Sequence, residues 1–266
     1  MNNLLNGENF KSIANVVIDQ TTLKSKRNYC DKDIIFCKTD YIGLLFNEIS
    51  NHKNSYTLIT HQSDYEIDEY VFNFKPQCIK KWYAQNVNYV HQDLIPLPIG
   101  LENHIGPSKG IFTDFNYWKN QYSFEKKYKK TNIVYCNFTP DNHPSRKEWV
   151  EKLKLNGIKT ATEKTSYKDH IENLQKSYFC ISPRGNGIDC HRTWEALYLD
   201  CIPIVPKHFM YDAFKNYIFQ VSDPNAINVK NLKNSKFKNE INKDQLKFSF
   251  WKNKILNYGR PNQHNL

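Results

Sequence analysis

The sequence predicts an α/β protein made of two domains, each built on a parallel sheet. Two observations lead to this prediction. Short apolar, β-branched runs alternate with segments whose apolar residues recur at helical spacing, and the alternation lapses once, over the Lys-rich residues 106–130. We therefore expect residues 1–130 and 131–266 to form separate domains, both Rossmann-like and doubly wound, facing a central cleft.

In the first half, apolar runs predict strands, and the one at residues 93–103 contains two prolines that restrict it to a sheet edge or end it. The segment 79–87 is expected to be a short helix that packs through Trp82 and Val87. The predicted strands are 33–39, 55–61 and 93–103, and the predicted helices are 40–50 and 79–87.

The second half repeats the pattern. Its first helix is expected to begin at a Ser cap and to end at Gly157. Trp82, Trp149 and Trp194 are expected to be packing residues. The predicted strands are 131–138, 178–183 and 201–206, and the predicted helices are 145–157, 167–177 and 190–200.

Composition excludes several other classes of protein. With 39% hydrophobic and 24% charged residues among 266, the chain is globular and not disordered, collagen-like or coiled-coil. No stretch approaches the ~18 apolar residues that a membrane helix requires, and the amino terminus lacks the layout of a secretory signal. We expect a soluble protein that is not exported.

The seven cysteines are an odd number in a long chain, and no two of them form a C-x-x-C pair. Four lie in apolar stretches, where a free Cys acts as a small hydrophobe. We expect reduced thiols in a cytoplasm and no structural zinc. The seven are Cys30, Cys37, Cys78, Cys136, Cys180, Cys190 and Cys201.

The net charge of +10 is concentrated late in the chain. After residue 206 the sequence has 11 Lys and Arg against 4 Asp and Glu, which accounts for +7 of the total. This Lys/Asn-rich sequence is typical of a solvated face, and it is also compatible with a surface that attracts a polyanion. Both interpretations stay open.

The most informative segment is YFCISPRGNGIDCHRTWEALYLDCIPIV, residues 178–205. A buried strand leads into a polar loop, then a helix and a second buried strand. Ligands of parallel sheets bind at the carboxyl ends of the strands, so the loop lies where a ligand is expected. Gly185 and Gly187 permit close backbone approach. Free N–H groups of the helix start, together with Arg184 and Arg192, suit a diphosphate.

Asp189, Arg192 and Glu195 recur every three residues and therefore share one helix face. A carboxylate on that face can hydrogen-bond the two hydroxyls of a ribose. An ordinary interpretation is also open, in which Arg192 and Glu195 form a surface pair and the glycines serve a turn, because a G-x-G loop alone is a weak signal.

The run at 178–205 resembles the nucleotide-sugar-binding segment of exostosin-like glycosyltransferases, a GT-B group with soluble bacterial and viral members. In that group an S-P-R-G-x-G loop and an H-R-x-W-E-A-L helix occur together. ITHQSDYEI, KPQCIKKWYAQNV and PLPIGLEN are similar to recurrent N-terminal blocks of such members, so the resemblance spans roughly residues 33–210. Asp200 departs from it, since such segments usually have Gly there.

The resemblance implies a GT-B-like fold and a hexosyl- or pentosyltransferase that moves a sugar from a UDP- or GDP-linked donor to an acceptor hydroxyl. The C-terminal domain would hold the donor and the N-terminal domain the acceptor glycan. GT-B enzymes usually stabilise the leaving diphosphate with Arg or Lys and a helix dipole, so we expect an inverting reaction without metal or cofactor. The expected location is the cytoplasm of a bacterial or virus-infected cell, with no membrane span and no obligate protein partner.

Carried over residue by residue, Arg184 and Arg192 would contact the diphosphate, and Glu195 the ribose or the donor sugar. Residues 185–187 would form the loop under the phosphates, and His143, at a strand-to-helix turn, would reach the diphosphate. The expected donor-binding residues are Ser182, Arg184, Gly185, Asn186, Gly187, Asp189, His191, Arg192, Glu195 and His143.

Inverting transfer needs a base that accepts the proton of the acceptor hydroxyl. His61 and Asp64 follow the strand at 55–61, and Glu102 follows the strand at 93–103, so these three are the candidates. Each is equally compatible with a loop or cap residue.

The segment Asp31-Lys32-Asp33 has the spacing of the D-x-D metal motif found in the other large glycosyltransferase fold. That motif follows a buried strand, whereas this one precedes a strand. We expect a solvated turn and no metal site.

Two other functions stay open. In the first, the acceptor is a modified base in viral DNA. The basic C-terminal tail and the Lys/Asn/Ile-rich composition favour this possibility. In the other, the chain is a nucleotide- or glycan-binding module without turnover, which lacks a working base in its first domain.

Overall fold

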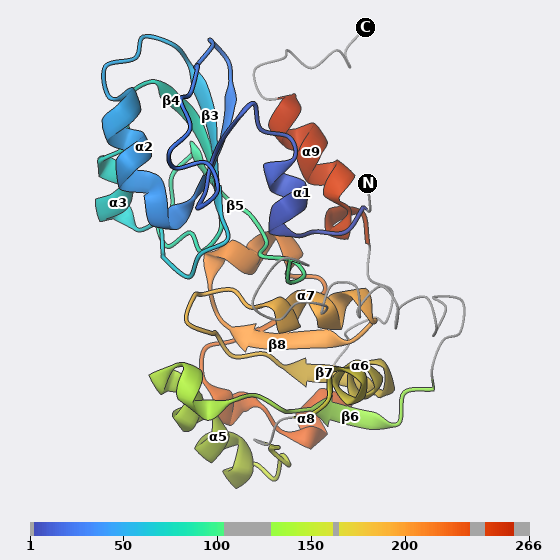
Figure 1. Ribbon diagram of the computed structural model, residues 1–266. Helices are drawn as coiled ribbons and strands as arrows, with labels where there is room; N and C mark the ends of the chain where they lie inside the picture. The colour runs from blue at the N-terminus through green and yellow to red at the C-terminus, as the bar shows by residue number, and fades with distance from the viewer. Residues whose placement is uncertain (1–2, 104–128, 162–164, 235–242, 258–266) are drawn as a thin grey trace, which may run out of the picture. The chain divides into compact units, whose positions relative to one another are not determined.

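The computed structural model describes residues 3–103, 129–161, 165–234 and 243–257 (Figure 1). The chain divides into two compact units: unit 1 is Met1–Leu97 with Asn242–Leu266, and unit 2 is Pro98–Ile241. This division differs from the expected one, because the C-terminal segment joins the first unit. The linker expected at 106–130 lies outside the described residues, except for residues 129 and 130.

Among the described residues of unit 1, five parallel strands form one sheet in the order β1-β2-β3-β4-β5. The central strands are almost wholly buried, as their continuous apolar runs predict. The proline-containing β5 is an edge strand, also as predicted. The strands are β1 (Val16–Ile18), β2 (Ile34–Lys38), β3 (Tyr56–His61), β4 (Ile79–Ala84) and β5 (Leu94–Pro96).

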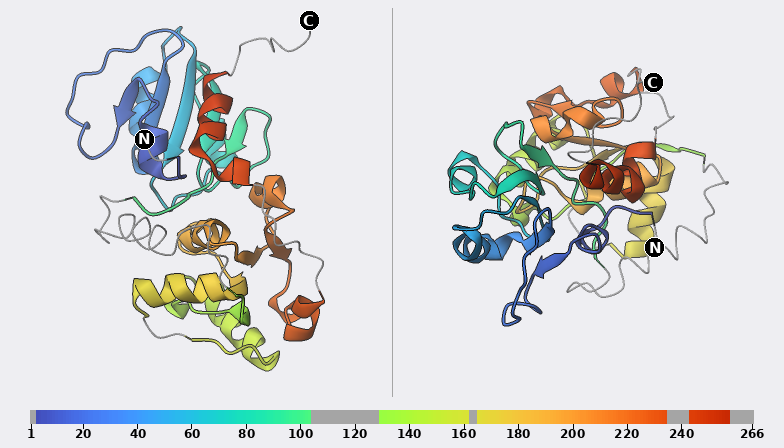
Figure 2. Two further views of the ribbon diagram at one scale, coloured as in Figure 1. Left: turned by 90° about the vertical axis from the view of Figure 1, so that its right-hand side faces the viewer. Right: turned by 90° about the horizontal axis from the view of Figure 1, so that it is seen from above.

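Helices cover both faces of this sheet (Figures 1 and 2). On one face, Trp82 of β4 packs between Phe46 of α2 (Ile42–Ile49) and Phe72 of α3 (Glu69–Asn73). On the other face lie α1 (Gly7–Lys11) and α9 (Phe248–Leu256), whose Phe10 and Phe248 rings meet with centroids 5.7 Å apart. The backbone N–H of Phe248 also donates to the carbonyl of Asn3. The second face is therefore covered by the two ends of the chain.

The helix predicted at 79–87 is wrong, because residues 79–84 form strand β4. The backbone of this segment pairs with β3 on one side and with β5 on the other. Trp82 and Tyr83 then point to opposite faces, where both are buried. A short apolar run has no decisive period of its own, and here the pairing partners on both sides determine its conformation.

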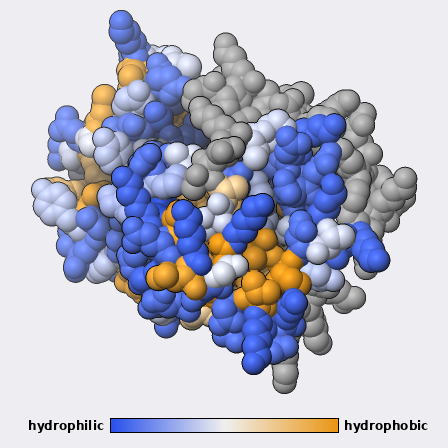
Figure 3. All heavy atoms as spheres, turned by 90° about the horizontal axis from the view of Figure 1, so that it is seen from below, coloured by the Kyte–Doolittle hydropathy of each residue, from blue (hydrophilic) through white to orange (hydrophobic). Residues whose placement is uncertain are grey.

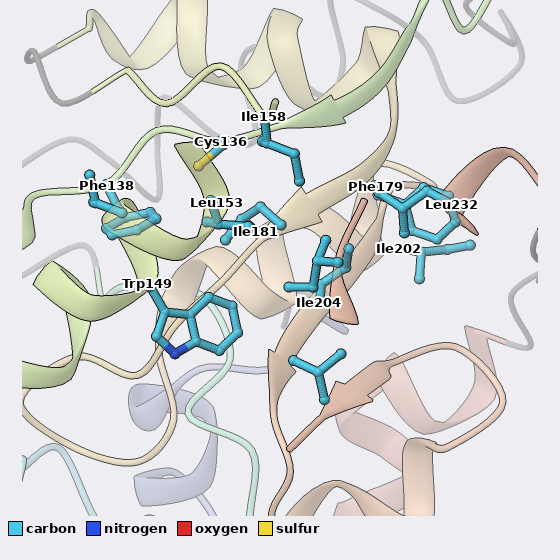
Figure 4. Packing of buried hydrophobic residues seen from close by; sticks show 13 residues of the cluster. Cys136, Phe138, Trp149, Leu153, Ile158, Phe179, Ile181, Ile202, Ile204 and Leu232 are labelled. Atoms are coloured by element: carbon cyan, nitrogen blue, oxygen red, sulfur yellow. The ribbon is translucent and has the colours of Figure 1, made fainter. Parts of the chain in front are cut away.

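Unit 2 has a second parallel sheet, in the order β6-β7-β8-β9 among the residues described. Apolar side chains of its strands pack against α5, and Figure 4 shows Trp149 and Leu153 beside Ile181 and Ile204. The elements are β6 (Asn132–Tyr135), α5 (Pro144–Leu155), α6 (Tyr167–Lys176), β7 (Ser177–Ile181), α7 (His191–Tyr198), β8 (Ile202–Pro206), β9 (Phe219–Val221) and α8 (Val229–Lys233).

Short 3-10 turns occur in both units. In unit 1 they are η1 (Thr39–Tyr41) and η5 (Lys243–Leu246), and in unit 2 they are η2 (Pro140–Asn142), η3 (Phe209–Phe214) and η4 (Pro224–Ala226).

Two parallel sheets with helical cover are consistent with the expected pair of Rossmann-like α/β domains. In neither sheet does the strand order reverse among the described strands, so the doubly wound arrangement expected from the sequence is not seen. Alternation of strands and helices predicts parallel pairing, but it carries no information about the side on which the next strand is added. A reversal of the strand order would place connecting helices on the second face of the sheet. In unit 1, α1 and α9 cover that face instead.

Local signals at the helix ends were partly correct. The N-cap of α5 is His143 and not the predicted Ser145, because Pro144 already occupies the first helical position. Gly157 follows the helix with a φ of 71°, as the predicted terminal glycine should. Asp200 adopts a φ of 55°, the left-handed conformation that explains why Gly suits this turn between α7 and β8.

All seven cysteines are free thiols, and five of them are buried, in agreement with the sequence. In the part of the chain that the structure describes, no helix is long and apolar enough to span a bilayer. The face of the molecule in Figure 3 is mainly hydrophilic, with hydrophobic atoms at the lower centre of the view and in smaller groups elsewhere. The large hydrophobic side chain that the described part of unit 2 exposes is Leu155.

Gly7 offers a test of the packing between α1 and the end of β3. A Cβ at Gly7 would lie 2.6 Å from Cγ of Gln62 and 2.9 Å from Nδ1 of His61. We expect Gly7→Ala to lower the free energy of unfolding by about 1–3 kcal/mol, because the added methyl group overpacks this contact.

The matched control is Gly43→Ala in α2, where a Cβ meets no atom within 4 Å. This exposed helical substitution is expected to raise stability by about 0.5–1 kcal/mol. Urea unfolding of the two variants measures both effects. Equal stability of the two variants would contradict the close approach of α1 to β3.

Candidate functional site

The carboxyl ends of β6 and β7 and the start of α7 meet in unit 2, as predicted for the ligand loop. Ser182, directly after β7, continues the ladder by donating its N–H to Ile204 O of β8. Its buried Oγ lies 2.9 Å from Oγ1 of Thr193 and 3.2 Å from Sγ of Cys190. Ser182 thereby fixes the start of α7 to the end of β7, and this supporting role accounts for its burial.

Arg146, in the first turn of α5, is a site residue that the sequence interpretation missed. It is 4% exposed, and it donates from Nε to Arg184 O at 2.6 Å and from Nη1 to Thr139 O at 3.0 Å. The side chain thus bridges the chain after β6 and the loop after β7. The signal for it in the sequence was its place in PDNHPSR, at a strand-to-helix turn like the one that holds Arg184.

The guanidinium of Arg146 is compensated by carbonyl groups and by no carboxylate among the described residues. Burial lowers the pKa of Arg146 from its usual value, and the positive charge of Arg192 lowers it further. Two guanidinium groups therefore lie close enough to repel one another. Such a pair is costly unless an anion lies between or beside them.

Arg192 is the second member of this pair, in the first turn of α7. Its Nε is buried and has no hydrogen-bond partner among the described residues, and no ion pair involves this side chain within them. Buried polar atoms in folded proteins nearly always have partners, so the orphaned donor calls for a ligand or a water. The alternative interpretation, in which Arg192 and Glu195 form a surface pair, does not hold, because Glu195 is buried and is hydrogen-bonded to His170 and Tyr167.

The predicted loop lies beside these two arginines. Arg184 folds back on it, with Nη2 3.0 Å from Asn186 O. Gly185 faces Arg146, since a Cβ there would lie 3.7 Å from Nη2 of Arg146, an ordinary contact distance. Asn186 is exposed and Gly187 is buried. Residues 185 and 186 therefore keep solvent exposure beside Arg146, while their carbonyl oxygens accept from the Arg184 side chain.

Asp189 has a different role from the ribose contact that its spacing suggested. Its buried carboxylate accepts hydrogen bonds from Trp194 Nε1 at 2.8 Å and from the Tyr211 hydroxyl at 3.1 Å. It also accepts from the backbone N–H groups of Ile99 and Cys190 at 2.8 and 2.9 Å. With its oxygens engaged in this way, Asp189 holds the loop in place and is not available to a ligand.

Glu195 lies one turn further along α7 and is 6% exposed. Its Oε1 accepts from the Tyr167 hydroxyl at 3.0 Å, and its Oε2 lies 3.1 Å from His170 Nε2. Burial raises the pKa of this carboxyl, but the hydrogen bond and charge of His170 lower it by more, so it lies below its usual value. Glu195 is therefore ionised at neutral pH and keeps acceptor capacity on both oxygens.

The two histidines of the expected donor site are held by hydrogen bonds within unit 2. His191 Nδ1 lies 2.8 Å from Gly100 O, which can only accept, so this nitrogen carries the proton. His143 uses its Nδ1 to cap α5, accepting from the N–H of Ser145 at 3.2 Å. His191 stands at the start of α7, as predicted, and His143 is a helix cap.

The three candidate bases fall in different units. His61 and Asp64 belong to unit 1, and Glu102 belongs to unit 2 because Ile99 and Gly100 are bonded to Asp189 and His191. His61 is 1% exposed, and its Nδ1 accepts from the N–H of Gln62, so its basic nitrogen is already engaged. Asp64 is exposed and Glu102 is partly exposed.

The residues Asp31-Lys32-Asp33 form a turn before β2, as expected. Their carboxylates accept backbone N–H groups, Asp31 from Ser55 and Asp33 from Cys30. Across the described residues, no group of three or more His, Cys, Asp or Glu side chains is placed to hold a metal ion.

No protein-family model matches this chain, and no curated protein matches it at a significant level of similarity. The resemblance to exostosin-like glycosyltransferases therefore stays a prediction.

Asp189 gives a test of the loop's anchoring. Burial raises the pKa of its carboxyl from 3.8 to about 6, against the lowering effect of its hydrogen bonds. The folded protein then binds this proton more tightly than the unfolded chain, so the group's contribution to stability is largest below pH 4 and is lost as the pH rises through 6. The change is about 3 kcal/mol at most.

We expect Asp189→Asn to be less stable than the wild type, with a difference that grows as the pH is lowered from 7 to 4. Asparagine cannot take up this proton, and its amide group replaces an acceptor with a donor. Urea unfolding at several pH values measures the difference, with Asp212→Asn on the surface as the control. A difference that stays constant with pH would contradict the assignment.

Proposed function

We propose that the chain is a glycosyltransferase that moves a sugar from a nucleoside diphosphate donor to an acceptor hydroxyl, and that unit 2 binds the donor. The observation that carries the proposal is the guanidinium pair of Arg146 and Arg192, which forms no ion pair with a carboxylate among the described residues and in which Nε of Arg192 has no hydrogen-bond partner there. The pair lies at the carboxyl ends of two parallel strands and at the start of α7, where ligands of such sheets bind.

A diphosphate fits this arrangement for electrostatic reasons. It carries negative charge on several oxygens, and an arginine can donate two parallel hydrogen bonds to such a group. Arg192 in the first turn of α7 adds its charge to the partial positive charge of the helix start. Gly185 and Asn186 of the loop keep solvent exposure beside Arg146, so a ligand can approach the arginine from that side. A diphosphate would therefore satisfy Nε of Arg192 and relieve its repulsion with Arg146.

The same groups support a reaction in which the diphosphate is the leaving group. Negative charge develops on its bridging oxygen as the bond to the sugar breaks, and the two guanidinium groups stabilise that charge more strongly than they stabilise the bound donor. Because these cations come from the protein, we propose a metal-independent reaction. Glu195, ionised and placed one turn further along α7, would bind the ribose of the donor.

For the inverting reaction, we propose Asp64 and Glu102 as the bases to be tested first. Both carboxyl groups retain exposure to solvent, whereas the Nδ1 of His61 is occupied by the N–H of Gln62. A base must reach the acceptor hydroxyl at hydrogen-bond distance, so at most one of these side chains performs the proton transfer.

The basic tail gives less support to a DNA acceptor than the sequence suggested. Its charge is divided between the units: residues 207–241 carry 6 Lys and Arg against 3 Asp and Glu in unit 2, and residues 242–266 carry 5 against 1 in unit 1. Polyanion binding requires cations gathered on one surface. We therefore propose a hydroxyl of a glycan as the acceptor.

The donor site is tested by calorimetric binding of UDP and GDP to Arg192→Ala, Arg146→Lys and the wild type. Loss of a charge-assisted hydrogen bond costs about 1.5–3 kcal/mol, so Arg192→Ala should weaken the preferred nucleotide by about 10- to 100-fold. Arg146→Lys keeps the charge but loses the bridge to Arg184 O and Thr139 O, and a smaller loss is expected.

The matched control is Lys147→Ala, which removes an exposed positive charge next to Arg146 in α5 and should leave the affinity unchanged. Addition of EDTA should also leave it unchanged. Full affinity in Arg192→Ala would overturn the proposed site. Affinity that disappears with EDTA would overturn the proposed metal independence.

A further inference from the structure

A chain of hydrogen bonds connects strand β6 with helices α6 and α7 through side chains alone. The Tyr135 hydroxyl, at the end of β6, lies 3.1 Å from His170 Nδ1 on α6. His170 Nε2 lies 3.1 Å from Oε2 of Glu195 on α7. The Tyr167 hydroxyl, also on α6, donates to Oε1 of the same carboxylate at 3.0 Å. Four side chains from three elements are thereby linked, and Glu195 accepts the last hydrogen bond of the chain on each of its two oxygens.

The direction of these bonds follows from the chemistry of the groups. An ionised carboxylate can only accept, so His170 Nε2 must carry a proton and donate to Glu195. In the neutral imidazole Nδ1 then accepts a hydrogen bond from the Tyr135 hydroxyl, which fixes the tautomer, and in the imidazolium Nδ1 donates to the hydroxyl oxygen. In either state Tyr135 holds the imidazole with Nε2 toward Glu195, and His170 orients the carboxylate, in the way that outer groups orient a metal-binding histidine.

Glu195 has acceptor capacity beyond these two bonds. A carboxylate offers about four lone-pair positions, and the described partners Tyr167 and His170 use one on each oxygen. One position on each oxygen is left, which matches two adjacent hydroxyl groups that both donate. The side chain keeps 8% of its exposure, so the described residues do not enclose it completely.

We propose that His170 and Tyr135 are positioning residues that hold Glu195 as a two-oxygen acceptor for the 2′- and 3′-hydroxyls of a ribose. The site would then select ribonucleoside diphosphates over 2′-deoxyribonucleoside diphosphates. This inference rests on the proposed function, because it assumes that a nucleotide occupies unit 2 with its diphosphate at Arg146 and Arg192. A deoxyribose would leave one buried lone pair of Glu195 unsatisfied.

The acidity of Glu195 depends on every charged or titratable group packed against it. These are His170 and Tyr167 on α6, Tyr135 on β6, which is bonded to His170, and His191 and Arg192 on its own helix. Burial alone raises the pKa of Glu195, and His170 makes the largest opposing contribution. Removal of the imidazole should therefore make the carboxyl take up a proton at higher pH than in the wild type.

The experiment compares UDP and GDP with their 2′-deoxy forms by calorimetry, in the wild type and in variants of the relay. The wild type should prefer the ribonucleotide by about 10- to 100-fold, the value of one hydrogen bond to a charged group. Glu195→Gln and His170→Phe should reduce the preference to about 3-fold or less, while the affinity for the deoxy form stays near that of the wild type.

Tyr135→Phe and His170→Gln test the positioning role itself. Tyr135→Phe removes the bond that sets the tautomer and should lower the preference part of the way. His170→Gln can still donate to Glu195 but lacks the imidazole charge. We expect this variant to keep the preference for the ribonucleotide at pH 8. As the pH is lowered, it should lose that preference at a higher pH than the wild type does, because its Glu195 takes up a proton at a higher pH. Tyr178→Phe, a partly buried tyrosine of β7 outside the relay, is the control and should change nothing.

The outcomes separate the two proposals. If neither UDP nor GDP binds the wild type, the proposed function itself is wrong. If a nucleotide binds but the wild type does not distinguish it from its deoxy form, Glu195 does not hold the ribose and this inference is overturned. Full preference in His170→Phe, or identical pH profiles of His170→Gln and wild type, would also overturn the positioning role.

Discussion

The buried carboxylate of Asp189 is the group on which the candidate site depends. It collects donors from the start of unit 2 through Ile99, from α7 through Trp194 and from η3 through Tyr211, besides the N–H of Cys190. A carboxylate is suited to this because it accepts on two oxygens from several directions, which no neutral side chain of that size does. Removal of Asp189 would release the loop and the first turn of α7 together. The cost is a charge kept out of water, and the raised pKa of this carboxyl measures that cost.

Around this anchor, charged groups of unit 2 are of two kinds. Asp189 and Glu195 are buried acids whose oxygens are met by donors from the protein, so their charge is compensated within the fold. Arg146 and Arg192 are cations that form no ion pair with a carboxylate among the described residues, although the charge of Arg192 acts on Glu195, and Arg192 has an orphaned buried donor. Folding alone does not account for the second kind, since a hydrophobic side chain would fill the same space at lower cost. That asymmetry supports our proposal that unit 2 binds an anion.

Much of this arrangement could be predicted from the sequence, because the signals were local. Continuous apolar runs located β2, β3, β7 and β8, and the pattern from Ser182 to Glu195 placed a polar loop at the start of a helix. What failed depends on contacts between distant residues. The helix predicted at residues 79–87 is wrong because the nine residues of that segment carry no information about its pairing with β3 and β5. Asp189 was assigned to a ligand because Ile99 and Tyr211, which engage it, are far from it in sequence. Arg146 was missed because only the folded chain brings it to Arg184 O.

The covering of unit 1 by both ends of the chain has a consequence for its biosynthesis. Strands β1 to β5 leave the ribosome first, yet Tyr83 and the face on which it lies meet α9 only after residues 248–256 have been made. Unit 2, encoded between them, is continuous and can complete its sheet while the first one still exposes an apolar face. Unit 1 therefore cannot complete its fold until unit 2 has been synthesised, although all five of its described strands precede unit 2 in the sequence.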